Sequence, residues 1–131
     1  MATVHTPFLK VIPQRHAGDC TVACLAMLLG VSYEASLLAF ASANIMTSGT
    51  YILHVIAAAL QLKRILKDRR KFDLENDTGM LVVDSDTWKV HHVVILKDGL
   101  IIDTDSTIWD ADIYLSIHKA KGTHLLTLED Q

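Results

Sequence analysis

One apolar segment, CTVACLAMLLG from Cys20 to Gly30, constrains the fold of this chain more than any other stretch. The segment is apolar on nearly every side of a helix, which is typical of a helix buried in the middle of a protein. Asp19 stands at the expected N-cap position, and Gly30 stands where a glycine commonly ends a helix. The segment therefore predicts a buried central helix.

The segments that follow predict two more helices and then a sheet. We expect helices over Ser32–Ala43, with Ser32 as its cap, and over Tyr51–Leu62, with a loop over Asn44–Thr50 between them. Short apolar runs predict strands at Met80–Val83, Val90–Leu96, Leu100–Ile102 and Leu125–Leu128. This order predicts an α+β fold, in which N-terminal helices pack on a C-terminal antiparallel sheet.

Length and composition indicate a single domain over residues 1–131. Half of the 131 residues are apolar, which is enough to build a core and excludes a disordered chain. The net charge is −3, and the one basic run, Lys67–Lys71, is expected to be a solvated helix end or loop. We therefore expect no nucleic-acid partner.

The N-terminus and the apolar runs predict the compartment of the protein. Met1–Lys10 lacks the apolar core of a signal peptide, and no apolar run is long enough to cross a bilayer. We therefore expect a cytoplasmic protein without a membrane span. In a reducing compartment Cys20 and Cys24 are expected to be free thiols, and a spacing of four along one helix face also disfavours a disulfide between them.

The position of Cys20 suits a nucleophile. Unpaired backbone N–H groups at a helix N-terminus, together with the helix dipole, favour a thiolate, which is the reactive form of cysteine. The alternative is that Cys20 is a small apolar residue of the core helix. Cys24, one turn further on, is expected to be buried and inert.

The chain before Cys20 carries a candidate oxyanion donor. Val4–Pro13 contains two prolines and is expected to be an extended segment or an edge strand, and Gln14–Asp19 is expected to be a loop. From this loop the amide of Gln14 can reach the space beside the Cys20 sulfur. There it can donate, with the Cys20 backbone N–H, to a developing oxyanion.

Two further segments supply a candidate base and an acid. A histidine of the His91–His92 pair can face the helix, and Asp103, after the strand Leu100–Ile102, can orient its ring. Asp98-Gly99 predicts a two-residue hairpin turn, so residues whose numbers add to an odd total share a face. His92 and Asp103 satisfy this rule. His92 is therefore the predicted base, although a bulge would select His91.

These motifs resemble the bacteriocin-processing cysteine peptidases, the papain-like domains that cut leader peptides after a double glycine. The shared features are the glutamine six residues before the cysteine, Asp-Cys, and Ala-Cys-Leu-x-Met on the same helix. A histidine before a valine-rich strand (HHVVIL) and an aspartate after the returning strand (IIDTD) also match, so the resemblance spans roughly Ile12 to Thr104.

The resemblance implies a stand-alone papain-like cysteine peptidase that forms a thioester on its nucleophile and needs no metal or cofactor. The implied roles are Gln14 as oxyanion donor, Cys20 as nucleophile, His92 (or His91) as base and Asp103 as orienting acid. The chain departs from the pattern at two positions. Thr21 replaces the glycine after the nucleophile, and Thr104 replaces the proline after the aspartate, which makes Asp105 an alternative acid.

Three other interpretations follow from the same residues. The same machinery performs deamidation or transamidation when the acyl donor is a glutamine side chain. A catalytically inactive papain-like module would instead bind a peptide or protein partner in the cleft. A zinc site that uses Cys20, Cys24 and two histidines is disfavoured, because the close ligand spacing of zinc sites is absent.

Overall fold

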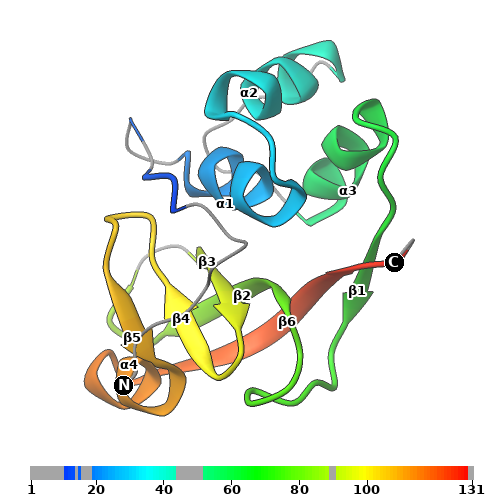
Figure 1. The fold of residues 1–131 in the computed structure, drawn as a ribbon. Coiled ribbons are helices and arrows are strands. Elements are labelled where there is room, and N and C mark those ends of the chain that lie inside the picture. The colour runs from blue at the N-terminus through cyan, green and yellow to red at the C-terminus, as the bar shows by residue number, and fades with distance from the viewer. Residues whose placement is uncertain (1–10, 14, 16–18, 44–51, 89–90, 130–131) are drawn as a thin grey trace.

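The computed structural model describes residues 11–13, 15, 19–43, 52–88 and 91–129. Three helices follow one another in the first part of the chain: α1 (Cys20–Leu29), α2 (Tyr33–Ser42) and α3 (Ile52–Gln61). Figure 1 shows them packed together on one side of the molecule. All three predicted helices are thus confirmed. The predicted loop at Asn44–Thr50 and most of the predicted extended segment Val4–Pro13 lie outside the described residues.

The first two helices have the ends that the sequence predicts. Helix α1 ends at Gly30, whose φ of 71° is left-handed and is readily adopted only by glycine. Helix α2 begins at Ser32, whose side-chain oxygen accepts a hydrogen bond from the backbone N–H of Ala35 at 3.0 Å. These two signals place the sharp turn between α1 and α2.

The rest of the chain forms an antiparallel sheet with the strand order β1-β6-β2-β3-β4-β5. Its strands are β1 (Leu66–Arg69), β2 (Gly79–Ser85), β3 (His92–Lys97), β4 (Leu100–Ile102), β5 (Ile108–Asp110) and β6 (Ala120–Leu128). The four predicted strands correspond to β2, β3, β4 and β6, so the predicted α+β class is confirmed.

Two strands and one helix were not predicted. The basic run Lys67–Lys71 was expected to be a helix end or a loop, but its first residues belong to β1, an edge strand in which only Leu66 is buried. Charged side chains on an edge strand discourage pairing with another chain. The short strand β5 and the helix α4 (Ala111–Ile117) occupy the region after Thr104.

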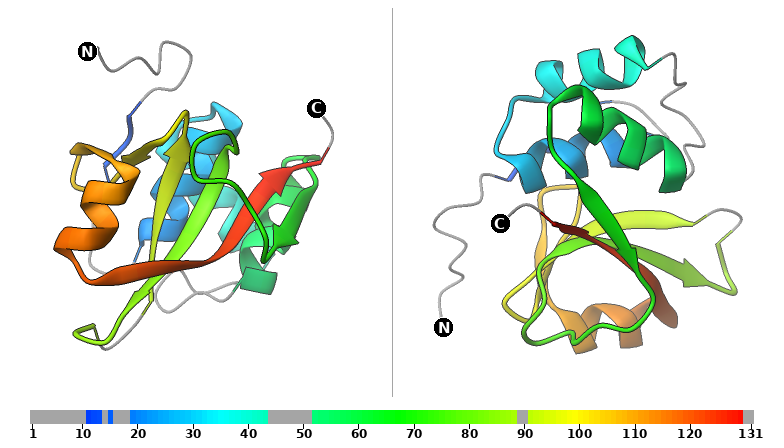
Figure 2. Two further views of the ribbon diagram at one scale, coloured as in Figure 1. Left: turned by 90° about the horizontal axis from the view of Figure 1, so that it is seen from below. Right: turned by 90° about the vertical axis from the view of Figure 1, so that its right-hand side faces the viewer.

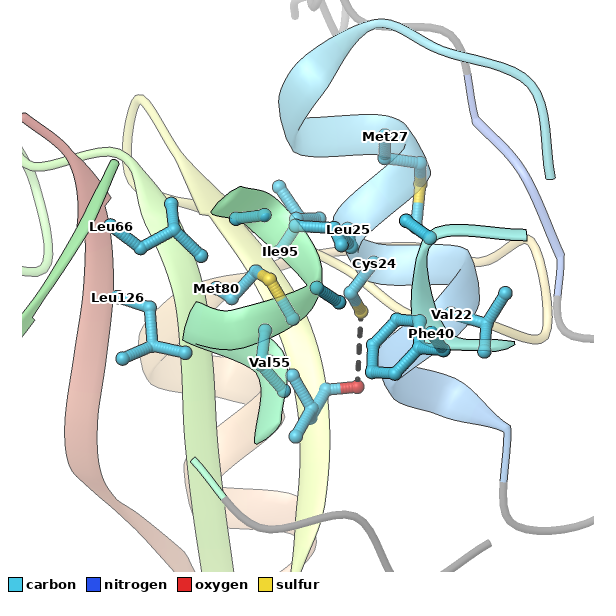
Figure 3. Packing of buried hydrophobic residues seen from close by; sticks show 14 of the residues in the cluster. Val22, Cys24, Leu25, Met27, Phe40, Val55, Leu66, Met80, Ile95 and Leu126 are labelled. Carbon is cyan, nitrogen blue, oxygen red and sulfur yellow. Dashed lines mark hydrogen bonds between the residues drawn. The ribbon is translucent and has the colours of Figure 1, made fainter. Parts of the chain in front are cut away.

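The sheet separates two layers of helix. Helices α1, α2 and α3 cover one face and α4 lies against the other, as the two views in Figure 2 show. Alternate residues of β3 divide between these faces: Val93 and Ile95 belong to the cluster under α1–α3, and Val94 and Leu96 to the cluster under α4. Figure 3 shows the first cluster, in which Cys24 packs beside Phe40 and Val55.

No single helix in the described part of the chain is long and apolar enough to cross a membrane. Helices α1 and α2 pass that test only when they are counted together, and they are bent by 113° at the break between them. Helix α1 is the buried centre of the fold, with residues 21–27 all buried.

Candidate active site

The candidate nucleophile, Cys20, is the first residue of α1 and is partly exposed. Asp19 precedes it at the N-cap position, as predicted, and its backbone carbonyl accepts from the N–H groups of Val22 and Ala23 at 3.0 and 3.3 Å. Its side chain does not cap the helix. The predicted N-cap is therefore correct in position, but the Asp19 carboxylate serves another contact.

That contact ties Asp19 to Arg15 and to the start of α2. Asp19 is buried, and its Oδ2 accepts hydrogen bonds from the Tyr33 hydroxyl and from the Arg15 backbone N–H. The Arg15 guanidinium lies 4.2 Å from the centre of the Tyr33 ring and forms an ion pair with Glu34 at 2.7 Å. The start of α2 thus holds both ends of the loop between Arg15 and Asp19.

The base and the acid are brought together by the hairpin of β3 and β4. Lys97 pairs with Leu100 and Ile95 pairs with Ile102, so the predicted two-residue turn at Asp98-Gly99 is confirmed. The φ angles of Asp98 (53°) and Gly99 (79°) are both positive, as such a turn requires. This register points His92 and Asp103 to the same face of the sheet.

The two histidines have different partners. His92 Nε2 lies 2.7 Å from Asp103 Oδ1, and the Cys20 thiol is near enough to the ring to raise the pKa of His92. Because Asp103 occupies Nε2, Nδ1 is the ring nitrogen left for the sulfur. His91 is exposed and lies 3.7 Å from Asp84 instead. The structure therefore brings Cys20, His92 and Asp103 together, and places His91 elsewhere.

Several donors converge on the Asp103 carboxylate. Oδ1 accepts from the Thr104 backbone N–H at 2.7 Å as well as from His92, and Oδ2 accepts from the Tyr114 hydroxyl at 2.9 Å. The alternative acid, Asp105, is exposed, and its Oδ1 accepts from the backbone N–H of Thr107 at 3.0 Å. Asp103, rather than Asp105, is thus the carboxylate that contacts His92.

The charges of this group perturb one another. Burial lowers the pKa of His92, but hydrogen bonds to Asp103 and to Cys20, with the negative charges of both, raise it to about 10. Burial raises the pKa of Asp103, but the His92 hydrogen bond and charge, with donors from Tyr114 and Thr104, hold it below its usual value. The pair is therefore arranged as an imidazolium and a carboxylate.

The predicted oxyanion donor, Gln14, lies outside the described residues. Its neighbour Pro13 lines a cavity of about 490 Å³ with His92, Asp103, Thr104 and Asp105. Pro13, the residue before Gln14, therefore borders the same space as the histidine and the carboxylate.

Cys24 is fully buried, and its thiol donates to the Val93 carbonyl oxygen at 3.3 Å, the dashed line in Figure 3. Burial, followed by the negative charges of Cys20 and Asp103, raises the pKa of Cys24 well above its usual value. It therefore has the surroundings of a structural cysteine. Within the described residues, no group of three or more His, Cys, Asp or Glu side chains could hold a metal ion.

One residue of the site is not predicted from the sequence: Tyr114, which contacts Asp103 from α4. A signal for this helix is present, because Asp110 accepts from the N–H groups of Asp112 and Ile113 at 3.0 and 3.4 Å as an N-cap. Two tryptophans pack beside the site: Trp109 makes an edge contact with the Tyr114 ring, and Trp88 makes one with the His92 ring.

This arrangement can be compared with known proteins. No family model matches the chain, and no curated protein matches it. Among solved structures, the peptidase domain of Streptococcus ComA, a bifunctional ABC transporter involved in quorum sensing, superimposes with a TM-score of 0.67. The two are 18% identical, and the match covers 94% of this chain and 99% of that domain. The chain has the fold of a double-glycine peptidase domain.

A second solved structure has the same fold. It is a double-glycine motif protease from an AMS/PCAT transporter, in complex with the leader peptide, with a TM-score of 0.63 and 20% identity. The match covers 92% of this chain and 90% of the protease. The papain-like fold that the sequence motifs predict is thus confirmed, because the chain folds like these peptidase domains.

Proposed function

We propose that this chain is a cysteine peptidase that cleaves a peptide bond through a thioester on Cys20. The observation that carries the proposal is the position of one histidine beside both partners: His92 Nε2 lies 2.7 Å from Asp103 Oδ1, and Cys20 is near enough to the His92 ring to raise its pKa. This is the arrangement of nucleophile, base and orienting acid that acyl transfer requires. Coming from segments far apart in the chain, the three groups meet only in the folded protein.

In the first half of the reaction, the Cys20 sulfur attacks the peptide carbonyl while His92 carries the thiol proton. The Cys20 backbone N–H, at the start of α1, and the Gln14 amide stabilise the oxyanion. The carbon–nitrogen bond then breaks as His92 protonates the leaving amine. In the second half, His92 takes a proton from water, the resulting hydroxide attacks the thioester, and Cys20 is released with the free acid.

The substrate class is proposed from the fold. One neighbour was solved with a leader peptide bound, so a peptide is the expected substrate of this chain. Cys20 is partly exposed, and a cavity lies beside His92 and Asp103, so these groups can be reached from solvent.

The proposal is tested by incubating the full chain with a panel of synthetic peptides that contain double-glycine sites, and by reading the products by mass spectrometry. We expect cleavage by the wild type and none by the Cys20→Ala variant. Hydroxylamine added to the wild type should trap the acyl group as a hydroxamate. His91→Ala serves as a matched control, because His91 lies outside the site, and this variant should cleave normally.

Two outcomes would replace the proposal. Conversion of glutamine side chains in the peptides, without chain cleavage, would assign the same machinery to deamidation or transamidation. Peptide binding that is equal in the wild type and Cys20→Ala, with no product of any kind, would assign a binding module.

A further inference from the structure

The carboxylate of Asp103 stands at a point where the backbone alone does not fix its direction. Strand β4 ends at Ile102, and Asp103 begins a turn that is closed by hydrogen bonds from its N–H to the Thr107 carbonyl at 2.9 Å and from the Ser106 N–H to its own carbonyl at 3.1 Å. A side chain on such a turn can rotate. The donors to the carboxylate therefore decide how its plane is oriented toward His92.

The donors divide between the two oxygens. His92 and the Thr104 N–H both occupy Oδ1, whereas the Tyr114 hydroxyl, at 2.9 Å, occupies Oδ2. Without a donor on Oδ2, the carboxylate could twist about its bond to the chain and turn its plane away from His92. A donor on Oδ2 holds this plane and keeps a carboxylate oxygen directed at Nε2 of His92.

Tyr114 is itself held rigidly. It is 1% exposed, and its ring packs against His118 at 4.5 Å and against Trp109 at 5.9 Å between ring centres. Its helix, α4, is capped by Asp110 and is tied to the β3–β4 turn by a hydrogen bond from the Ala111 N–H to the Gly99 carbonyl at 2.9 Å. The hydroxyl is thus fixed relative to the hairpin that carries His92.

We infer that Tyr114 is a positioning residue of the site, which orients Asp103 and through it His92. This inference rests on the proposed function, because a positioning role presupposes an active site. The hydrogen bond itself can be tested without a substrate. The hydroxyl stays a donor, since burial and then the charge and hydrogen bond of Asp103 raise the pKa of Tyr114 far above neutrality.

Several titratable groups act on Asp103 or on its neighbours, and the test must separate the effect of the Tyr114 hydroxyl from theirs. His92 on β3 lowers its pKa, and the Tyr114 hydroxyl does so from α4. From α1, Cys20 interacts with His92 and Cys24 interacts with Asp103. Asp105 acts on Tyr114 by its charge. Replacing only the Tyr114 hydroxyl leaves every other group in this set in place.

The test is a titration of the Asp103 side-chain carboxyl carbon by NMR in the wild type, Tyr114→Phe and Ser36→Ala. The phenylalanine keeps the ring and removes one donor, so the pKa of Asp103 should rise by about one to two pH units. Ser36→Ala is the matched control: it also removes one buried hydroxyl, but this hydroxyl donates to the Val22 carbonyl at 2.8 Å. It should leave the Asp103 titration unchanged.

An unchanged titration in Tyr114→Phe, or an equal shift in both variants, would overturn the inference. If Tyr114→Phe does not fold, the hydrogen bond is tested in the wild-type protein instead. The Tyr114 hydroxyl proton should then be a slowly exchanging NMR signal that shifts in Asp103→Asn, and its absence would also overturn the inference. An inert Cys20 together with a shifted Asp103 would reject the peptidase and leave the positioning contact standing.

Discussion

His92 is the histidine of the site whose pKa is strongly raised by its neighbours. Its ring is partly buried, which disfavours its charged form, yet hydrogen bonds to Asp103 and Cys20 raise the pKa to about 10 from the ordinary value of 6.5. Because the folded protein binds this proton more tightly than the unfolded chain does, protonation of His92 stabilises the fold. That stabilisation is fully present below pH 6.5 and is lost as the pH rises to about 10.

This sign gives a prediction for a His92→Gln variant. The difference in free energy of unfolding between the wild type and the variant should be largest below pH 6.5 and should shrink steadily toward pH 10. Urea unfolding at several pH values measures it, with His91→Gln as the control for an exposed histidine of the same strand end. A difference that is constant across this range would show that the His92 charge contributes nothing to stability.

At the scale of elements, helix α4 contributes both to the stability of the fold and to the contacts of the site. Asp110 caps α4 and Ser32 caps α2 by the same kind of hydrogen bond, from a backbone N–H to a side-chain oxygen, at 3.0 Å in both cases. Loss of either cap in an alanine variant should cost about 1 kcal/mol of unfolding free energy. Helix α4 carries Tyr114, which contacts Asp103, and the start of α2 carries Tyr33, which contacts Asp19, so each change reaches the site from a different side.

We therefore expect Asp110→Ala to slow alkylation of Cys20 in the native protein. Asp110→Asn is the matched control, because asparagine is an equally good N-cap, and it should leave the alkylation rate at the wild-type value. Denaturant unfolding measures the stability of both variants, and mass spectrometry measures the alkylation rate. A wild-type alkylation rate in an Asp110→Ala variant that has lost stability would mean that α4 does not support the site.

The elements that are predictable from the sequence have strong local signals, and those that are not predictable have weak ones. The α1 segment is predictable because its apolar residues, its cap position and its stop at Gly30 all agree. The β1 strand is missed because only Leu66 is buried and its partner β6 lies far along the chain. Helix α4 has only seven residues, too few for a clear apolar period.

The candidate site shows the same division. The turn at Asp98-Gly99 is a local signal, so the register that pairs His92 with Asp103 follows from the sequence by alternation. The contact of Tyr114 with Asp103 depends on how α4 packs across the sheet, which local pattern does not encode. The choice of Asp103 over Asp105 likewise depends on a turn whose hydrogen bonds form only in the fold.

At the scale of the whole molecule, the site is assembled from three layers. Cys20 comes from the helical layer, His92 and Asp103 come from the sheet, and Tyr114 comes from the helix on the opposite face (Figure 2). The two hydrophobic clusters that hold these layers share β3, through alternate residues such as Val93 and Val94. The chemistry proposed for Cys20 is therefore a property of the complete fold.

The rate of iodoacetamide labelling of Cys20 as a function of pH tests this account most directly, in the native wild type and in His92→Ala and His91→Ala, with labelled sites read by mass spectrometry. Cys24, fully buried, is the internal control and should label only after unfolding. We expect Cys20 to label fast well below the free-thiol pKa of about 8.5, and His92→Ala alone to abolish this. Labelling no faster than that of an ordinary thiol, with neither variant having an effect, would contradict the claim that His92 activates Cys20.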